Sequence, residues 1–456
     1  MIAADQKKAV RRWQKNISFL GIVAAILVLW WAFEQAPRMP VARLEEVGVT
    51  VLDESGQDFK DALEIGRRSI ASNSADRAEA VKRGKNISDQ PLVYGFFPYW
   101  NMKSGFEVPH VVTDLAFFRL LAQENGLLVF DQNSDGSWQE VMPLQAWLDM
   151  TETWQSSFPG KRRELVIFQD DPEQLEQLLL NEEAIDTLVL QVHQVLEAKT
   201  QKEDQPDWRG INLDFEYFGT ASEPVRDGMS LLLSKLRLLI GQYHPEVRLT
   251  VDVFGKLAYR SQGLFDWESV AENVDYVILM GYDYTTRSSI VPGPVAPTIG
   301  RSRWGNDILG AVEALAKKIP SYQIILGVPY YGYQWEVTTF DLSNSRTYPE
   351  TGRTLTYQRV QEMLVEKEAL GITEGWDEAS LTPFFYYEGD EERPDGTGKV
   401  KYLAFYENEE SLKYKLDLIN GMGLGGMAIW ALGYEGMETG VGLWDLVRTE
   451  LYEVAR

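Results

Sequence analysis

Apolar and polar residues alternate strictly along residues 209–218, which read Arg-Gly-Ile-Asn-Leu-Asp-Phe-Glu-Tyr-Phe. Strict alternation predicts a β-strand, whose successive side chains point to opposite sides. The polar side chains on one face of this strand are Asn212, Asp214 and Glu216. Two carboxylates and an amide are costly to bury in a structural core. The pattern therefore predicts either a strand whose polar face serves a function or an exposed edge strand of an antiparallel sheet.

Short apolar runs of this kind recur from residue 91 onward and alternate with longer helical stretches. Several of the runs are apolar throughout, which is typical of parallel strands covered on both faces. Eight βα repeats over about 360 residues favour a TIM (β/α)8 barrel, an α/β fold, over a doubly wound sheet. The eight expected strands are Leu92–Phe97, Val111–Phe118, Glu164–Phe168, Gly210–Phe215, Arg248–Phe254, Val274–Met280, Gln323–Val328 and Gly426–Ala431.

Two stretches carry clear helix signals. Asp171 followed by Pro172 predicts a helix start, because an N-cap residue precedes proline at the first helical position. Further on, apolar residues recur at helical spacing and predict a face that packs on the sheet. These residues are Ile185, Leu188, Val192 and Leu196.

An insertion separates the seventh and eighth expected strands, which lie roughly 95 residues apart, far more than a usual connection. Within it, Tyr357–Gly371 predicts a helix, and Thr382–Tyr387 and Val400–Tyr406 predict strands. We expect a small α+β subdomain at about 334–406 on the rim of the barrel. The glycine-rich residues 421–426 resemble a dinucleotide-binding loop but precede a strand, so we predict a tight turn there.

The N-terminus predicts a membrane segment. Residues 17–33 are uncharged and apolar, and five cations precede them against a single Asp5. The alternatives are a signal peptide, an uncleaved anchor and a buried core helix. The run is long for a signal peptide and no small-x-small cleavage site follows, which favours a single-pass transmembrane anchor within 1–33. The positive flank predicts a cytoplasmic N-terminus, a stalk at 34–90 and a barrel at 91–456 outside, in a bacterial periplasm or at the cell surface.

Composition narrows the function further. The formal net charge of −24 argues against nucleic acid as a partner. The chain has no Cys, which excludes disulfides, thiolate metal sites and cysteine nucleophiles. His110, His193 and His244 lie far apart in sequence, so we expect ordinary structural roles for them and neither a metal site nor a cofactor. Residues 131–142 begin like a calcium loop, but Met142 stands where the bidentate Glu belongs, which favours a polar turn.

The carboxylates of the alternating strand predict acid–base chemistry. Catalytic groups of a TIM barrel sit at the C-terminal ends of strands, where Glu216 falls. Asp214 and Glu216 are about 6.5 Å apart at Cα with parallel side chains. Both cannot ionise easily at that spacing, so the pKa of one should rise. Glu216 would then stay protonated and act as a general acid, while Asp214 accepts a hydrogen bond from the substrate or from Asn212.

The stretch offers one acid, Glu216, and an adjacent assisting carboxylate, Asp214, but no second carboxylate placed as a nucleophile. This arrangement is typical of substrate-assisted glycoside hydrolysis. In that reaction the 2-acetamido oxygen of the sugar itself attacks the anomeric carbon. A metal site is the other use of Asn-x-Asp-x-Glu on a strand, although the sequence offers no evident further ligands.

From about residue 91 to the C-terminus the chain resembles glycoside hydrolase family 18, the chitinase-like family. Residues 209–216 match the family signature Asp-Gly-x-Asp-x-Asp-x-Glu that ends strand four. Arg209 and Asn212 depart from that signature, and Asn at this place is similar to the spore-cortex and peptidoglycan-directed branch. Further matches to strands one, six, seven and eight of the family follow in order: Gly95–Trp100, Met280–Tyr284, Gly327–Gly332 and Gly425–Trp430.

The resemblance implies a retaining hydrolase of β-linked, N-acetylglucosamine-containing glycans. Phe168–Asp171 stands where many chitinases have Ser-x-Gly-Gly, which favours peptidoglycan or a surface polysaccharide over chitin. Glu216 would protonate the glycosidic oxygen, Asp214 would orient the acetamido group, and Tyr282 would donate a hydrogen bond to the oxazolinium-like intermediate. The implied substrate-binding residues are Asn212, Met280, Asp283, Tyr331 and Trp430.

Two other functions remain open at this point. One is a catalytically silent, membrane-anchored relative that binds glycan as a lectin does. The other is a structural envelope protein that reuses the barrel. Silent members of the family usually lose the acid, so the presence of Glu216 favours the enzyme.

Overall fold

The computed structural model describes residues 63, 76–101, 106–130, 142–143, 147–148, 151, 160–197, 208–259, 263–393, 396, 398–436 and 440–453. All of them belong to the second of two compact units of the chain, Leu52–Arg456. The predicted anchor at 17–33, most of the predicted stalk at 34–90 and the calcium-loop-like residues 131–141 lie outside the described residues. Within the described part, no helix is both long enough and apolar enough to cross a membrane.

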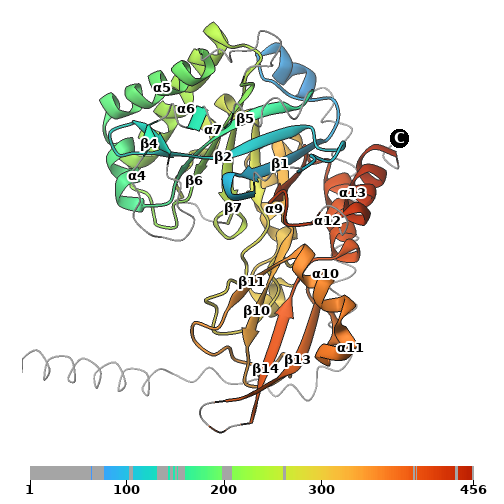
Figure 1. Ribbon diagram of the computed structural model, residues 1–456. Coiled ribbons are helices and arrows are strands. Elements are labelled where there is room, and N and C mark those ends of the chain that lie inside the picture. The colour runs from blue at the N-terminus through green and yellow to red at the C-terminus, as the bar shows by residue number, and fades with distance from the viewer. Residues whose placement is uncertain are drawn as a thin grey trace, which may run out of the picture. The chain divides into compact units, whose positions relative to one another are not determined.

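Parallel strands close into a barrel in the order β1-β15-β9-β8-β7-β6-β5-β2, and β1 pairs with β2 to complete the ring (Figure 1). Each strand overlaps one of the eight stretches expected from the apolar pattern, so the predicted TIM barrel is confirmed. The strands are β1 (Leu92–Pro98), β2 (Asp114–Ala122), β5 (Arg162–Gln169), β6 (Gly210–Phe215), β7 (Arg248–Phe254), β8 (Tyr276–Met280), β9 (Ile324–Pro329) and β15 (Gly426–Trp430).

The largest difference from the expected strands is in β2, which begins three residues later than predicted and runs on to Ala122. The Val112 N–H donates to the Pro109 carbonyl (3.1 Å) and closes a turn, so the backbone becomes free to pair only after it. Beyond the barrel, β3 (Leu128–Phe130) and β4 (Met142–Pro143) continue this sheet in antiparallel fashion.

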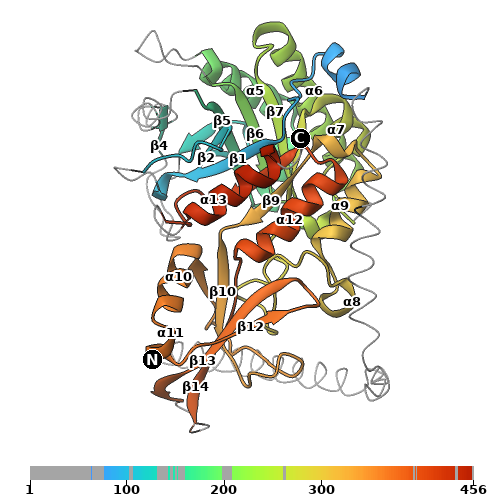
Figure 2. The same cartoon turned by 90° about the vertical axis from the view of Figure 1, so that its right-hand side faces the viewer.

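Helices cover the outside of the barrel, and Figure 2 shows α12 and α13 packed beside each other over β9 and β1. Asp171 caps α4 by accepting from the backbone N–H groups of Glu173 and Gln174, as predicted. The predicted apolar face of α5 is buried. The helices are α4 (Pro172–Leu179), α5 (Glu182–Glu197), α6 (Glu223–Tyr243), α7 (Trp267–Asn273), α8 (Arg301–Trp304), α9 (Ile308–Ala316), α12 (Glu409–Met422) and α13 (Val441–Arg448). The glycine-rich residues 421–426 form the turn from α12 into β15, as expected.

A buried ion network fills the barrel interior toward the N-terminal ends of the strands. The guanidinium of Arg248 contacts Asp114 and lies 3.5 Å from Glu164, and the Tyr94 hydroxyl donates to Glu164 (2.8 Å). A Cβ on Gly210 would lie 2.3 Å from the Glu164 side chain. The glycine of the signature stretch is therefore required because Glu164 occupies the space beside it.

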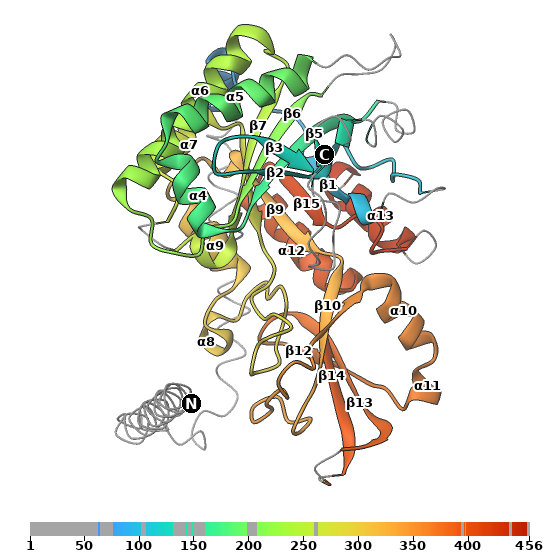
Figure 3. The same cartoon turned by 60° about the vertical axis from the view of Figure 1, so that its left-hand side comes forward.

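The long segment between β9 and β15 contains a second sheet, in the order β11-β10-β14-β13-β12, with antiparallel pairings. Figure 3 shows β9 continuing almost directly into β10. The helix and the two strands predicted in this segment are present, although the helix is divided in two. The elements are β10 (Tyr331–Glu336), β11 (Arg353–Thr356), α10 (Tyr357–Val365), α11 (Lys367–Leu370), β12 (Thr373–Asp377), β13 (Thr382–Glu392) and β14 (Lys399–Phe405).

Candidate active site

A cavity of about 690 Å³ lies at the C-terminal ends of the barrel strands. Ten aromatic side chains make most of its wall: Phe96, Tyr99, Trp100, Phe118, Phe168, Phe254, Tyr282, Tyr331, Trp430 and Tyr434. The other lining residues are Asp214, Glu216, Asp252, Asp283, Arg119 and Met280. Aromatic rings around a few converging polar groups form the kind of concave site in which small polar ligands bind.

The structure brings together seven of the eight residues predicted for the site. Asp214, Glu216, Met280, Tyr282, Asp283, Tyr331 and Trp430 all line the cavity. Asn212 does not line it, and its side chain is fully buried one layer below, on the same face of β6. Asn212 therefore supports the site from beneath, which corrects the expectation that it contacts substrate.

Glu216 follows β6 directly, and its backbone N–H donates to the Gln169 carbonyl (2.9 Å). Burial, the largest cause, and the negative charges of Asp214, Asp170 and Asp283 together raise the pKa of the Glu216 carboxyl to about 9, although Arg119 opposes them. The carboxyl therefore holds a proton at neutral pH. This is the state that a general acid needs before it donates.

Asp214 and Asp252 form a buried carboxylate pair on neighbouring strands. Asn212 lies opposite Thr250 in the β6–β7 register, and the two aspartates each come two residues later. Burial raises the pKa of each well above its usual range, and the charge of Asp252 raises that of Asp214 further. Because two adjacent carboxylates do not both ionise easily in a low-dielectric site, the pair retains a proton.

Asn212 is bonded to Asp252 and not to Asp214, so of the two donors expected for Asp214 the substrate is the one that stays a prediction. Its side-chain amide donates to Asp252 Oδ1 (2.6 Å) and to Thr250 Oγ1 (2.9 Å), which uses both of its N–H groups. Within the described residues, Asp214 Oδ1 and Asp252 Oδ2 have no hydrogen-bond partner. Buried oxygens of this kind are rare in structural cores, and here they lie beside a ligand-sized cavity.

Asp283 is held at the mouth of β8 by two tyrosines from β10. The hydroxyls of Tyr331 and Tyr333 donate to Asp283 Oδ1 at 2.6 and 2.8 Å. Asp283 adopts a φ of 57°, in the left-handed region that non-glycine residues seldom occupy. Since β10 begins the second sheet, this sheet contributes two side chains that fix a carboxylate of the cavity.

Tyr282 and Trp430 supply a donor and a flat ring. Burial raises the pKa of the Tyr282 phenol well above its usual value, so the hydroxyl stays protonated and can donate. The Trp430 ring is fixed by edge contact with Phe118, at 4.8 Å between centroids, and by a tilted contact with Phe96 at 5.5 Å. These contacts fix the Trp430 ring in the cavity wall, where an aromatic surface can stack on a sugar.

Three polar residues of the site were not predicted: Arg119 and Asp252, which line the cavity, and Tyr333, which donates to Asp283. Asp252 carried a usable signal, because Thr250 and Asp252 alternate with Leu249 and Val251 as the polar residues of β6 do. Arg119 lies 4.2 Å from the centroid of the Phe168 ring, a contact that sequence spacing does not predict.

No metal-binding group was found among the pocket carboxylates. Across the described ranges, one group of His, Asp or Glu side chains has all its ligand atoms within 4.8 Å of one another, and it consists of His193, Glu197 and His244. It lies on α5 and at the end of α6, away from the cavity.

Comparisons with known proteins agree with the barrel. The chain is 25% identical over 374 residues to the cortical fragment-lytic enzyme of Bacillus subtilis. The aligned region covers 80% of this chain and 72% of that enzyme. It is 27% identical over 241 residues to the class V chitinase of Arabidopsis thaliana, over 50% of this chain and 58% of the relative. The fold matches the crystal structure of a Cycas revoluta chitinase in complex with (GlcNAc)3, with a TM-score of 0.60, 16% identity, and coverage of 79% of this chain and 99% of that one.

The family model for glycosyl hydrolases family 18 matches residues 166–435, which include β6 and every cavity residue from Phe168 to Tyr434. This match covers more than half of the chain, and the relatives of the chain in this family are glycoside hydrolases and chitinases. The chain belongs to the glycosyl hydrolases family 18.

Proposed function

We propose that this protein is a retaining glycoside hydrolase that cleaves β-linked, N-acetylglucosamine-containing glycans by substrate-assisted catalysis. The observation that carries the proposal is Glu216, a carboxyl whose pKa is raised to about 9 at the end of β6, facing an aromatic-walled cavity. A carboxyl that keeps its proton at neutral pH beside a sugar-sized cavity is the defining feature of a glycosidase general acid.

In the first step, Glu216 transfers its proton to the glycosidic oxygen, and the bond from that oxygen to the anomeric carbon breaks. The carbonyl oxygen of the substrate's own 2-acetamido group attacks the same carbon and forms an oxazolinium-like intermediate. In the second step, the Glu216 carboxylate takes a proton from water, and the resulting hydroxide attacks the anomeric carbon from the face that the leaving group left. Two inversions give net retention of configuration.

The neighbouring side chains have distinct roles in this scheme. The Asp214–Asp252 pair shares one proton, so Asp214 can accept a hydrogen bond from the acetamido N–H and oppose the positive charge of the intermediate. The Tyr282 hydroxyl donates to the acetamido oxygen. Trp430 stacks under the sugar ring, and Met280 packs beside it.

The proposed substrate is a peptidoglycan-type or surface glycan. Supporting observations are the cortical fragment-lytic relative and the aromatic cavity, together with Asn212 in the signature stretch. The (GlcNAc)3 that the Cycas revoluta chitinase binds supports N-acetylglucosamine as the sugar at the cleavage site.

Cleavage assays on the full-length chain test this function. We expect the protein to release reducing ends from peptidoglycan and from labelled N-acetylglucosamine oligomers. Chromatography of the products measures this release. A silent glycan-binding relative would bind both ligands in equilibrium measurements and release nothing. Binding without any cleavage would therefore contradict the proposed hydrolase and favour the lectin-like alternative.

We further propose that residues 17–33 anchor the protein in a membrane as a single-pass segment, with the N-terminus cytoplasmic and the barrel outside. Full-length protein expressed in bacteria should sediment with membranes, resist extraction by salt and be released by detergent. The double variant Ala25→Arg and Leu27→Arg should leave the membrane, because each Arg costs about 2.5–3.5 kcal/mol at the centre of a span. Recovery of the wild type without membranes, or an N-terminus that begins after residue 33, would contradict an uncleaved anchor.

A further inference from the structure

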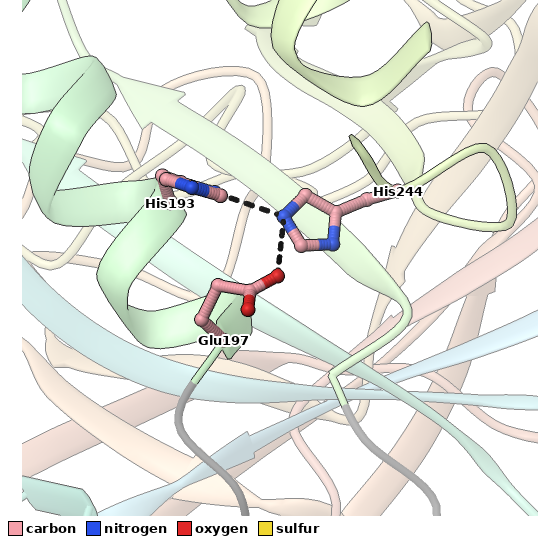
Figure 4. Close-up of side chains that lie close together, drawn as sticks. All are labelled: His193, Glu197 and His244. Carbon is pink, nitrogen blue, oxygen red and sulfur yellow. Dashed lines mark hydrogen bonds and ion pairs between the residues drawn. The ribbon is translucent and has the colours of Figure 1, made fainter. Parts of the chain in front are cut away.

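Two histidines that are 51 residues apart in sequence meet at the outer helices of the barrel. His193 lies in the last turns of α5, and His244 is the C-cap residue of α6. His193 Nδ1 and His244 Nε2 are 3.0 Å apart, and Glu197 Oε1 is 3.6 Å from the same His244 nitrogen. Figure 4 shows all three side chains converging, with both contacts made at His244.

We propose that His193, Glu197 and His244 form a binding site for a divalent transition metal of the zinc type. Two ligands at about 2.0–2.1 Å from a tetrahedral zinc ion are about 3.3 Å apart. The observed separations of 3.0 and 3.6 Å lie on either side of that value, and all three ligand atoms are within 4.8 Å of one another. Small side-chain rotations would place the ion, and the fourth position would be taken by water.

The ligand set favours a transition metal over calcium or magnesium. Neutral imidazole nitrogen suits zinc, copper and nickel, whereas calcium and magnesium prefer an all-oxygen set. Glu197 contributes a carboxylate oxygen, which completes a set of two nitrogens and one oxygen, and its side chain is 61% exposed.

The competing arrangement is a plain hydrogen bond between the two rings. One ring would then donate and the other accept, with Glu197 contributing only charge. That hydrogen bond would involve the two ring nitrogens alone, whereas a metal ion would also bind the Glu197 oxygen. The His193–Glu197 spacing of one helical turn puts both groups on one face of α5, which a hydrogen bond to His244 alone does not require.

A metal here would connect the two helices that flank the candidate catalytic strand. The chain runs from α5 into β6 and from β6 into α6. Ligands from both helices would thus close a loop that contains Asp214 and Glu216. The site lies at the C-terminal ends of the helices, opposite the end of the barrel where the cavity opens, so its role would be structural.

Zinc titration of the full-length chain, prepared without a histidine tag and stripped with chelator, tests the proposal. We expect one Zn²⁺ per chain by calorimetry, a thermal midpoint that rises with Zn²⁺ but not with Mg²⁺, and visible absorption from bound Co²⁺. His193→Gln and His244→Gln should abolish these signals while keeping a side chain capable of hydrogen bonding. Glu197→Gln should weaken binding by at least about tenfold, the lower limit seen when even a supporting residue is lost at a metal site.

His110→Gln is the matched control, because His110 is the one remaining histidine of the chain and the chain has no Cys. This variant should bind Zn²⁺ as the wild type does. Failure of the wild type to bind Zn²⁺ at micromolar concentrations would overturn the proposal. So would unchanged binding in the His193→Gln, His244→Gln double variant, or glutamine variants that change stability equally with and without metal.

Discussion

Glu216→Gln lowers the rate of glycan cleavage by about 10²–10⁴-fold, the usual contribution of one general acid. Glutamine has nearly the same size and leaves the cavity wall intact, but it has no proton to give to the glycosidic oxygen. Substrate binding should be little changed, because Trp430 and the other rings remain. The measurement is kcat and KM on a labelled oligomer, and we expect the loss in kcat.

The pH profile gives this prediction a second readout. In the wild type, kcat/KM reports the free enzyme and should fall as pH rises through about 9, because Glu216 then loses its proton. The residual activity of the Gln variant should lack this alkaline limb. Thermal unfolding at neutral pH is the folding control, and the variant should be at least as stable, since the folded state holds the Glu216 pKa unfavourably high. Cleavage at the wild-type rate in the variant would exclude Glu216 as the acid.

Asp214→Asn should lower kcat by about 10²–10³-fold, the range found when one preorganised electrostatic group of an active site is removed. The asparagine can still accept a hydrogen bond from the acetamido N–H. It cannot carry the negative charge that opposes the oxazolinium-like intermediate in a buried position, where Asp214 is only 3% exposed. The effect should therefore fall on kcat and spare KM.

Asp252→Asn distinguishes the role of Asp252 from that of Asp214 in the carboxylate pair. Because the pair carries one proton in the wild type, Asp252 is neutral whenever Asp214 is charged, so the neutral asparagine should leave the acidic limb of the kcat profile close to its wild-type position. The loss of rate should be smaller than in Asp214→Asn, because Asp252 acts on the substrate through its neighbour. A shift of the acidic limb to lower pH, or a greater loss of rate than in Asp214→Asn, would contradict the shared proton.

Much of the fold could be predicted from local patterns. The apolar runs of the barrel strands and the cap at Asp171 depend on residues adjacent in sequence, and the structure has both. The same holds for Asp214 and Glu216, which reach one cavity because residues two apart on a strand share a face. Glu216 was predicted as the acid from its strand-end position, from its spacing to Asp214 and from the family signature. The burial that contributes most to its raised pKa depends on the whole fold.

Contacts between distant segments could not be predicted in this way. Asn212 was one of two donors expected for Asp214, but the β6–β7 register places Thr250 and Asp252 at its amide instead. His193 and His244 were judged separately because 51 residues divide them, yet the packing of α5 on α6 brings their rings together. Register and helix packing are set by the whole fold, so a single sequence gives no direct sign of them.

The most direct test of substrate-assisted catalysis by Glu216 is the anomeric configuration of the first product, followed by proton NMR during cleavage of an N-acetylglucosamine oligomer by the full-length protein. Retention requires the product to form first as the β-anomer and then to equilibrate with the α-anomer. We predict initial β-anomer from the wild type and none at a comparable rate from Glu216→Gln. Initial formation of the α-anomer would mean direct attack by water and would contradict the mechanism.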